Sequence, residues 1–362
     1  MTVTPVLWLS GAPGAGKTTV AWALYRELTR EGLEVGYVDI DQINMCYPEP
    51  ANDPGRFRLA ENNLAAVVAG FRTAGARAVI VSGCADPGRD SPALPNIALT
   101  RCGLRADPEV LHRRLVARRA DPAFIAAAMT APADQAGPSV DTTGLTVDEV
   151  VAEVRNRTAG WMDRTGPAQE TERRTPADGP ILWVCGPTGV GKSTAGFDFY
   201  LRHVLGAYVD LGQLGFFHRA DDKIKAGILA ALWRNFRDAG AEHLTIVGRA
   251  VNINSWEAYA KALPFSSLTV CRLQASAGEL TRRIMLRREG GPWAEPGDAL
   301  RNQPLPHLEA IAAKAVSEAA ALDRAALGAR GALGDLRDLR IDTDGQTPAQ
   351  TADEIARRRT LG

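Results

Sequence analysis

The sequence predicts an α/β protein made of two tandem domains, each a parallel sheet flanked by helices. Three observations support this. Short apolar runs alternate with helical stretches, a glycine-rich motif begins at residue 11 and again at residue 186, and a polar segment containing proline and glycine lies between the copies. Strands that alternate with helices form parallel sheets covered on both faces. With 362 residues, the chain is long for one domain and suits two.

Hydrophobic periodicity assigns the elements of the first half. Apolar positions at i, i+3, i+4 and i+7 begin at Leu64 and recur from Leu229, which predicts an amphipathic helix in each half. The apolar runs predicted as strands of the first half span 6–9, 35–40, 78–81 and 97–102.

The second half repeats segments of the first in the same order. VDIDQI at 38–43 corresponds to VDLGQL at 209–214, and TAGARAVIVSG at 73–83 corresponds to DAGAEHLTIVG at 238–248. Spacing between the repeats drifts, because loops tolerate insertions at little cost. We therefore expect a duplication, with domains at 1–160 and 179–362 joined by a linker at 161–178. Two halves of this kind can pack together as a pseudo-dimer.

Both glycine-rich motifs, GAPGAGKT and GPTGVGKS, fit the pattern G-x-x-x-x-G-K-[ST]. Such a P-loop presents backbone N–H groups and a helix N-terminus to a polyphosphate, in conformations that glycine adopts without strain. Its lysine reaches the outer phosphates and its hydroxyl binds Mg²⁺, so the motif predicts ATP and Mg²⁺ as cofactors. The expected nucleotide-binding residues are Gly11, Gly14, Gly16, Lys17, Thr18 and Thr19, and Gly186, Gly189, Gly191, Lys192, Ser193 and Thr194.

Two other classes of P-loop protein are excluded by the lysines. The chain has six, and none follows an asparagine, so the Asn-Lys-x-Asp motif of switch GTPases is absent. Neither loop carries the additional lysine near its start that marks the partitioning and metal-insertase ATPases.

The remaining pattern resembles the small P-loop kinases of metabolites: adenylylsulfate kinase, shikimate kinase, gluconate kinase and chloramphenicol phosphotransferase. The residues that carry the resemblance are Asp39 and Asp41 in VDIDQI, the FRLAE segment at 57–61, Gly83 and an arginine cluster at 113–119. The resemblance implies an adenylate-kinase-like fold. It also implies transfer of the γ-phosphate of ATP to a hydroxyl of a small, anionic metabolite.

The resemblance assigns a role to each of these residues. Asp39, with Thr18, lies on the Mg²⁺ side, whereas Asp41 binds the acceptor hydroxyl and takes its proton; Arg58 and Gly83 contact the acceptor. The arginine cluster Arg113, Arg114, Arg118 and Arg119 suits a lid that closes over the phosphates. Of these, Arg118 is the expected catalytic residue, together with Lys17, Asp39 and Asp41. Arg114 and Arg287 are expected to contact nucleotide.

The two halves are unequal. The second keeps Lys192 and the expected metal ligands Ser193 and Asp210, but Gly212 occupies the position of Asp41. Lys225 can replace Arg58 as a cation. We expect phosphotransfer mainly in the N-terminal half and a partly degenerate C-terminal half that binds nucleotide.

Two alternatives stay open: an ATP-binding or ATP-hydrolysing switch, and a kinase of nucleic-acid ends. The second is disfavoured because a net charge of +0 and 6% aromatic residues predict no basic, base-stacking channel. Composition also predicts a cytoplasmic bacterial protein without a membrane partner: the cysteines are scattered, no secretory signal is visible, and arginine and alanine are abundant. The acceptor and the oligomeric state stay open.

Overall fold

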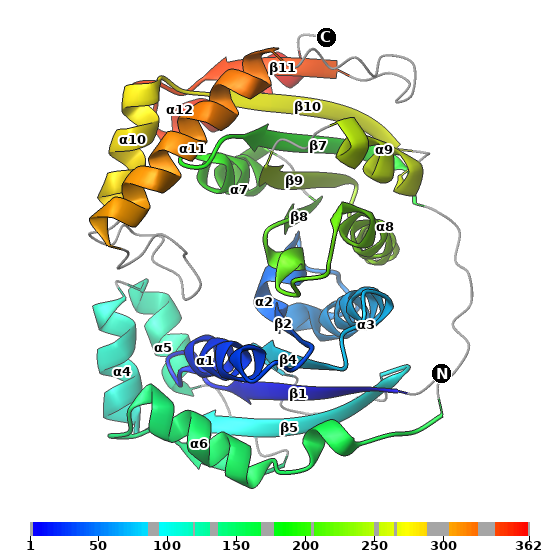
Figure 1. Ribbon diagram of the computed structural model, residues 1–362, viewed down its shortest axis with the longest axis vertical. Coiled ribbons are helices and arrows are strands. Elements are labelled where there is room, and N and C mark those ends of the chain that lie inside the picture. The colour runs from blue at the N-terminus through cyan, green and yellow to red at the C-terminus, as the bar shows by residue number, and fades with distance from the viewer. Residues whose placement is uncertain are drawn as a thin grey trace. The chain divides into compact units, whose positions relative to one another are not determined.

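The computed structural model describes residues 3–85, 94–118, 120–130, 137–167, 177–203, 206–249, 253–263, 266–287, 304–324 and 337–360. The chain divides into two compact units, which are described separately (Figure 1). Unit 1 comprises Met1–Ile43, Gly55–Arg173 and Gly215–Ile224. Unit 2 comprises Asn44–Pro54, Arg174–Leu214 and Lys225–Gly362.

Unit 1 contains a five-stranded sheet in the order β2-β4-β1-β5-β6, and all its strand pairs are parallel. The strands are β1 (Thr4–Gly11), β2 (Val35–Asp39), β4 (Ala78–Ser82), β5 (Ile97–Arg105) and β6 (Ser139–Asp141). Three of the four apolar runs predicted as strands lie within these strands, and the fourth, 35–40, is a strand as far as Asp39. The α/β fold class is confirmed.

Helices surround this sheet. They are α1 (Lys17–Arg30), α2 (Ile40–Ile43), α3 (Phe57–Thr73), α4 (Pro108–Ala117), α5 (Pro122–Thr130) and α6 (Val147–Arg157), with short 3₁₀ turns at Pro54–Arg56 and Trp161–Asp163. The N-terminus of α6 is fixed by a capping box between Thr146 and Glu149. The apolar face of α3 is buried as its spacing predicts, and Phe71 packs so closely on β2 that a Cβ at Gly36 would lie 2.5 Å from its ring.

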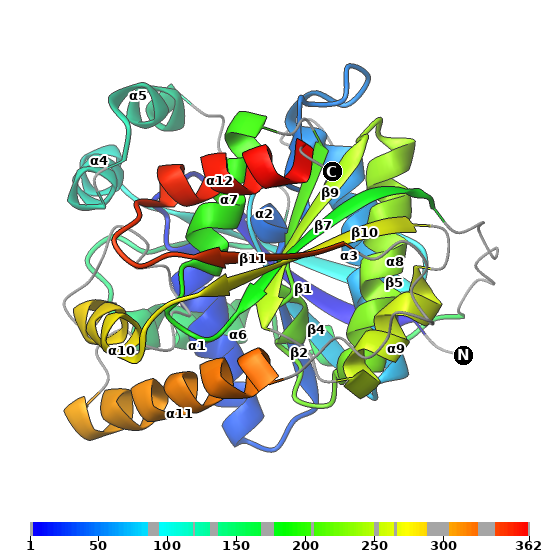
Figure 2. The same cartoon turned by 90° about the horizontal axis from the view of Figure 1, so that it is seen from above.

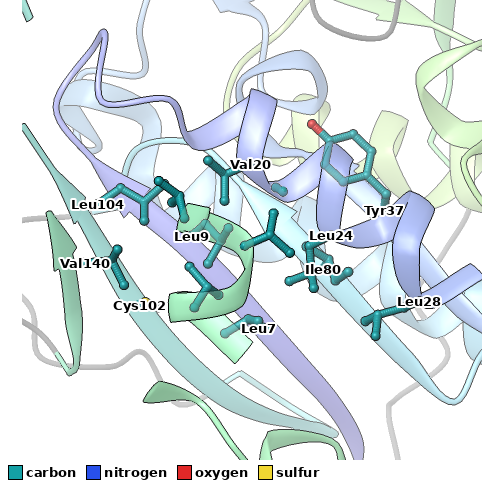
Figure 3. Packing of buried hydrophobic residues seen from close by; sticks show 14 of the residues in the cluster. Leu7, Leu9, Val20, Leu24, Leu28, Tyr37, Ile80, Cys102, Leu104 and Val140 are labelled. Carbon is teal, nitrogen blue, oxygen red and sulfur yellow. The ribbon is translucent and has the colours of Figure 1, made fainter. Parts of the chain in front are cut away.

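The core of unit 1 lies between the sheet and helices α1 and α6. Leu9 of β1, Leu24 of α1 and Ile80 of β4 are fully or almost fully buried in it (Figure 3). Removing this apolar surface from water stabilises the sheet, at roughly 25 cal/mol per Å². The carboxyl ends of β1 and β2 are thereby held at one edge, where the phosphate-binding loop begins.

Unit 2 repeats this topology. Its sheet has the order β11-β10-β7-β9-β8-β3, and the strands from β11 to β8 pair in parallel with the same connectivity as the sheet of unit 1. Figure 2 labels β11, β10, β7 and β9 of this sheet. The strands are β7 (Gly179–Gly186), β8 (Gly206–Asp210), β9 (His243–Arg249), β10 (Ser266–Gln274) and β11 (Arg337–Asp342). The repeated strand order agrees with the repeat in the sequence.

Helices α7 (Lys192–His203), α8 (Asp222–Asp238), α9 (Ile253–Ala262), α10 (Ala277–Leu286), α11 (Leu305–Arg324) and α12 (Pro348–Thr360) complete the second half, with a 3₁₀ turn at Gln213–Gly215. No helix within the described ranges is long and apolar enough to cross a membrane.

Each unit includes a short segment from the other half of the sequence. Strand β3 (Cys46–Tyr47) pairs antiparallel with β8 inside unit 2. Conversely, residues 215–224 belong to unit 1, where the Tyr37 N–H donates to the Phe216 carbonyl at 2.9 Å. The domain limits 1–160 and 179–362, with the linker 161–178, stay a prediction for the chain as a whole.

Phe217 offers a test of this arrangement. Its side chain is 1% exposed and its ring centroid lies 5.9 Å from that of Phe71. We expect Phe217→Ala to lower the free energy of unfolding by about 3–5 kcal/mol, because a large cavity would remain. Phe124→Ala is the matched control, since that ring is 50% exposed in α5. Urea unfolding measures both, and equal small effects would show that residues 215–224 do not form part of a core.

Candidate functional site

The first glycine-rich loop connects β1 to α1, as a P-loop requires. Gly11, Gly14 and Gly16 have φ values of 141°, 86° and 96°, in the region that other residues rarely adopt. At Gly11 a Cβ would also lie 2.1 Å from the Leu104 carbonyl oxygen. The loop conformation therefore depends on glycine, and it leaves a cradle of backbone at the N-terminus of α1, where anions bind favourably.

Lys17 begins α1 and folds back over this loop. Its side chain is largely buried, and Nζ donates to the carbonyls of Gly11 at 2.9 Å and Ala12 at 3.1 Å. These contacts hold the ammonium over the cradle, where its charge would meet the outer phosphates of a nucleotide.

Asp39 ends β2 and faces the start of α1. Its Oδ2 accepts a hydrogen bond from Thr18 Oγ1 at 3.2 Å, and its Oδ1 accepts one from the Asp41 backbone N–H at 3.1 Å. Burial, followed by the negative charge of Asp41, raises the pKa of Asp39 to about 7, although these hydrogen bonds oppose the shift. The predicted metal-side pair, Thr18 and Asp39, is thus assembled, with oxygen donors of the kind that Mg²⁺ prefers.

Asp41 lies on α2, beside Gly83. A Cβ at Gly83 would be 3.2 Å from Asp41 Oδ1, so the glycine leaves the carboxyl room. Part of Asp41 is open to solvent, but the protein around its carboxyl desolvates it and raises its pKa. The positive charges of Lys17 and Arg56 and a hydrogen bond from the Cys84 backbone oppose this shift. Lys17, Asp41 and Gly83 are therefore neighbours in one site.

Two side chains hold the backbone of this region. The buried Asn63 Nδ2 donates to the Ile43 carbonyl at 2.7 Å, which fixes the end of α2. Trp8 Nε1 donates to the Gly83 carbonyl at 3.3 Å, which fixes the turn after β4. Both bonds join elements far apart in sequence, so sequence patterns did not reveal them.

Sequence reasoning also missed Arg56 and Cys84. Arg56 has a left-handed φ of 59° just before α3, and its charge lowers the pKa of Asp41. Only its proximity to the motif FRLAE could have drawn attention to it. Cys84 is exposed, but the protein around its thiol desolvates it and raises its pKa, and the charge of Lys17 opposes this shift.

Arg114 binds the P-loop region itself. Its guanidinium donates to the Gly14 carbonyl at 3.2 Å, to Thr142 Oγ1 at 3.0 Å and to the Thr142 carbonyl at 3.1 Å. These bonds connect α4, the loop after β1 and the loop after β6. A role in holding the loop was not predicted, and its nucleotide contact stays a prediction.

The other predicted cations of unit 1 lie at the surface. Arg118 follows α4 and Arg58 lies in the first turn of α3, both with exposed side chains. Arg113 is also exposed on α4, and Arg119 lies outside the described residues. The lid and substrate roles of these arginines stay predictions.

The second glycine-rich loop has the same construction in unit 2. Lys192 Nζ donates to the Pro187 carbonyl at 2.8 Å. Ser193 Oγ donates to Asp210 Oδ2 at 2.9 Å, and Asp210 Oδ1 accepts from the Gly212 N–H at 2.8 Å. Burial raises the pKa of Asp210. The expected residues Gly186, Gly189 and Gly191 have φ values of 154°, 85° and 96°.

A cavity of about 630 Å³ lies beside this second loop. Its wall contains loop residues from Thr188 to Ala195, the end of α10 with Arg287, and the segment after β11 around Thr343 and Pro348. Arg283 joins these walls by donating to the Val190 carbonyl at 3.0 Å and to Thr343 Oγ1 at 2.9 Å. Lys192 and three arginines line the cavity together with Glu279, and a cavity of this volume suits a nucleotide.

The two sites differ in the second acid. In unit 1, residue 41 supplies a carboxyl beside Gly83, whereas in unit 2 the corresponding residue is Gly212. Leu211 and Gly248 are in contact there, since a Cβ at Gly248 would lie 3.0 Å from the leucine side chain. The metal-side pair is thus repeated without the second acid.

A glycine loop between the first strand and helix, followed by a lysine, a hydroxyl and an acid on the neighbouring strand, defines a P-loop nucleotide-binding fold. Residues 8–131, about a third of the chain, match a family described as an AAA domain. No curated protein matches the sequence.

Solved structures of kinases show limited similarity to the chain. A sugar kinase from a Janibacter species has 18% identity and a TM-score of 0.32, over 42% of this chain and 94% of that one. A gluconokinase from Sinorhizobium meliloti has 16% identity and a TM-score of 0.30, over 52% of this chain and 98% of that one. Similarity of this extent does not identify a substrate.

The raised pKa of Asp39 predicts a pH-dependent cost to stability. Between its unfolded value of about 4 and its folded value of about 7, the folded state binds more protons, so stability falls as pH rises and the loss is complete above 7. We expect Asp39→Asn to be more stable than the parent by about 1–3 kcal/mol at pH 8, with little gain near pH 4. Urea unfolding at both pH values measures the difference. A pH-independent difference would contradict the assigned shift.

Proposed function

We propose that this protein is an ATP-dependent phosphotransferase that moves the γ-phosphate to a hydroxyl of a small, anionic metabolite, with the chemistry in unit 1. One observation carries the proposal: a second carboxyl, Asp41, lies beside Gly83 and within the electrostatic influence of Lys17, while Asp39 is bound to Thr18. One acid thus serves the metal side and another is available to an acceptor.

The residues present fit Mg²⁺ and ATP. The glycine cradle and Lys17 would hold the phosphates, and Thr18 with Asp39 would hold the metal ion. When bound, Mg·ATP supplies the transferable phosphoryl group and neutralises charge on it. The protein contributes position: Asp41 orients the acceptor hydroxyl and accepts its proton, for which a raised pKa makes it a better base.

We propose that Arg58 binds the anionic group of the acceptor and that Arg118 stabilises the charge that develops on the phosphates. Both roles come from the resemblance noted above. Arginine suits both roles because its planar guanidinium binds oxyanions with two parallel hydrogen bonds. Unit 2, in this proposal, is a duplicated copy that binds nucleotide at Lys192, Ser193 and Asp210 but lacks the acceptor-side acid.

The experiment is a screen of hydroxylated metabolites for ADP release by the full chain with Mg·ATP. A phosphotransferase shows turnover that depends on one acceptor, and the product carries the phosphate. Slow hydrolysis that no metabolite stimulates would instead favour a nucleotide-driven switch. Oligonucleotides with free 5′-hydroxyl ends belong in the same screen, since their phosphorylation would indicate an end kinase.

A further inference from the structure

The chain crosses between the units immediately after each pair of acid positions. It leaves unit 1 after Ile43 and returns at Gly55, so residues 44–54 belong to unit 2. It also leaves unit 2 after Leu214, and residues 215–224 belong to unit 1. The two excursions occupy corresponding places in the repeat, because VDIDQI ends at 43 and VDLGQL ends at 214.

In unit 2 the incoming segment is bound to the strand that carries Asp210. The Tyr208 N–H donates to the Met45 carbonyl at 3.0 Å, and Cys46 pairs with Ala207 in the antiparallel ladder of β3 and β8. The Met45 side chain packs on the core cluster that contains Tyr208. Strand β8 therefore has no free edge at this point.

In unit 1 the other segment is attached to the strand that carries Asp39 by a backbone hydrogen bond and aromatic contacts. The Tyr37 N–H donates to the Phe216 carbonyl at 2.9 Å, and the Phe216 ring centroid lies 5.5 Å from that of Tyr37 and 5.0 Å from that of Trp22. Tyr37 and Tyr208 are 171 residues apart, as are Met45 and Phe216, so the two attachments correspond.

These attachments are close to the acids along the chain. Met45 follows Asp41 by four residues, and Tyr208 precedes Asp210 by two. Four residues span at most about 14 Å even when extended, so this connection is short. Asn63 further restrains it by holding the Ile43 carbonyl. A displacement at the end of β8 would thus be transmitted to α2, which carries Asp41.

We propose that the second P-loop is a regulatory site for a magnesium-bound nucleoside triphosphate, coupled to the first site through these exchanged segments. Occupation of Lys192 and Ser193 replaces the hydrogen bond between Ser193 and Asp210 with contacts to the ligand, and β8 carries the change to Met45. Allosteric coupling of this kind is reciprocal. Regulation of catalysis rests on the proposed phosphotransfer in unit 1. The coupling itself concerns only the nucleotide affinities of the two sites.

Binding of the ATP analogue AMP-PNP with Mg²⁺ tests the coupling without any acceptor. Calorimetry on Lys192→Ala measures the first site alone, and on Lys17→Ala the second alone. We expect the parent protein to bind two equivalents with constants that differ by at least about fivefold from those of the isolated sites. Constants equal to the isolated ones overturn the coupling, and no binding to Lys17→Ala overturns the second site. Neither result bears on phosphotransfer, which the metabolite screen decides.

A longer connection should uncouple the sites. Two glycines inserted after Asn44 leave β3 in place but slacken the chain between Asp41 and Met45, so we expect binding at both sites with constants equal to the isolated ones. The control is the same insertion after Gly144, an exposed turn residue with open space around it, which should preserve the coupling. Coupling retained with the first insertion overturns this route.

Hydrogen exchange provides a measurement that needs no insertion. In Lys17→Ala, AMP-PNP with Mg²⁺ occupies only the second site. We expect at least about a twofold change in amide exchange over 37–45, with none over α6, residues 147–157. Unchanged exchange over 37–45 at saturation overturns the proposal even if an inserted variant fails to fold.

Discussion

Lys17→Ala should reduce acceptor-dependent ADP release by at least about 100-fold, whereas Lys192→Ala should reduce it by less than about tenfold. Both lysines begin a helix after a glycine-rich loop and fold back onto loop carbonyls, so the two substitutions are chemically matched. In the proposed mechanism the difference arises from Asp41, which lies beside Gly83, whereas the corresponding residue of the second site is Gly212.

The measurement is steady-state ADP release with the acceptor that the screen identifies, at saturating Mg·ATP. Thermal unfolding of both variants controls for loss of structure. Equal losses in the two variants would show that both units contribute to catalysis, which would contradict the proposed asymmetry. A residual effect of Lys192→Ala within the stated limit is expected from the coupling between the sites.

Asp41→Asn should reduce turnover by about 10²–10⁴-fold while ATP affinity changes by less than about threefold. The amide keeps the shape of the side chain and can still accept a hydrogen bond from the Cys84 backbone, but it cannot take a proton. The hydrogen bond between Thr18 and Asp39, on the proposed Mg²⁺ side, does not involve the Asp41 side chain, although loss of the Asp41 charge removes one cause of the raised pKa of Asp39.

Asp148→Asn is the control for this substitution, since that carboxylate is exposed in the first turn of α6. Turnover and ATP binding are measured separately, the second by calorimetry with AMP-PNP. Loss of ATP affinity in Asp41→Asn would place this carboxyl on the nucleotide side and remove the argument for an acceptor there.

Sequence patterns were sufficient for the local parts of this molecule. The strand run 6–9 lies within β1, the glycines of both loops adopt left-handed or otherwise unusual φ values, and Asp39 ends β2. These features depend on residues close in sequence: backbone conformation requires glycine, and apolar periodicity reports the buried face of a strand or helix. The resemblance assigned both Asp41 and Gly83 to the acceptor, but their direct proximity is seen only in the structure.

Contacts between distant segments were decided only by the tertiary structure. Nothing local in Phe217 indicates that Phe71 is its partner, and nothing local in Arg114 indicates that it holds the loop at Gly14. The same is true of Arg56 beside Asp41. Likewise, a repeated sequence is compatible with two self-contained domains. In the structure, however, Met45 of the first half belongs to unit 2, and Phe216 of the second half belongs to unit 1. The reason is physical. A pattern in the sequence indicates that a side chain will be buried or hydrogen-bonded, but only the packing of the whole chain determines which residue is its partner.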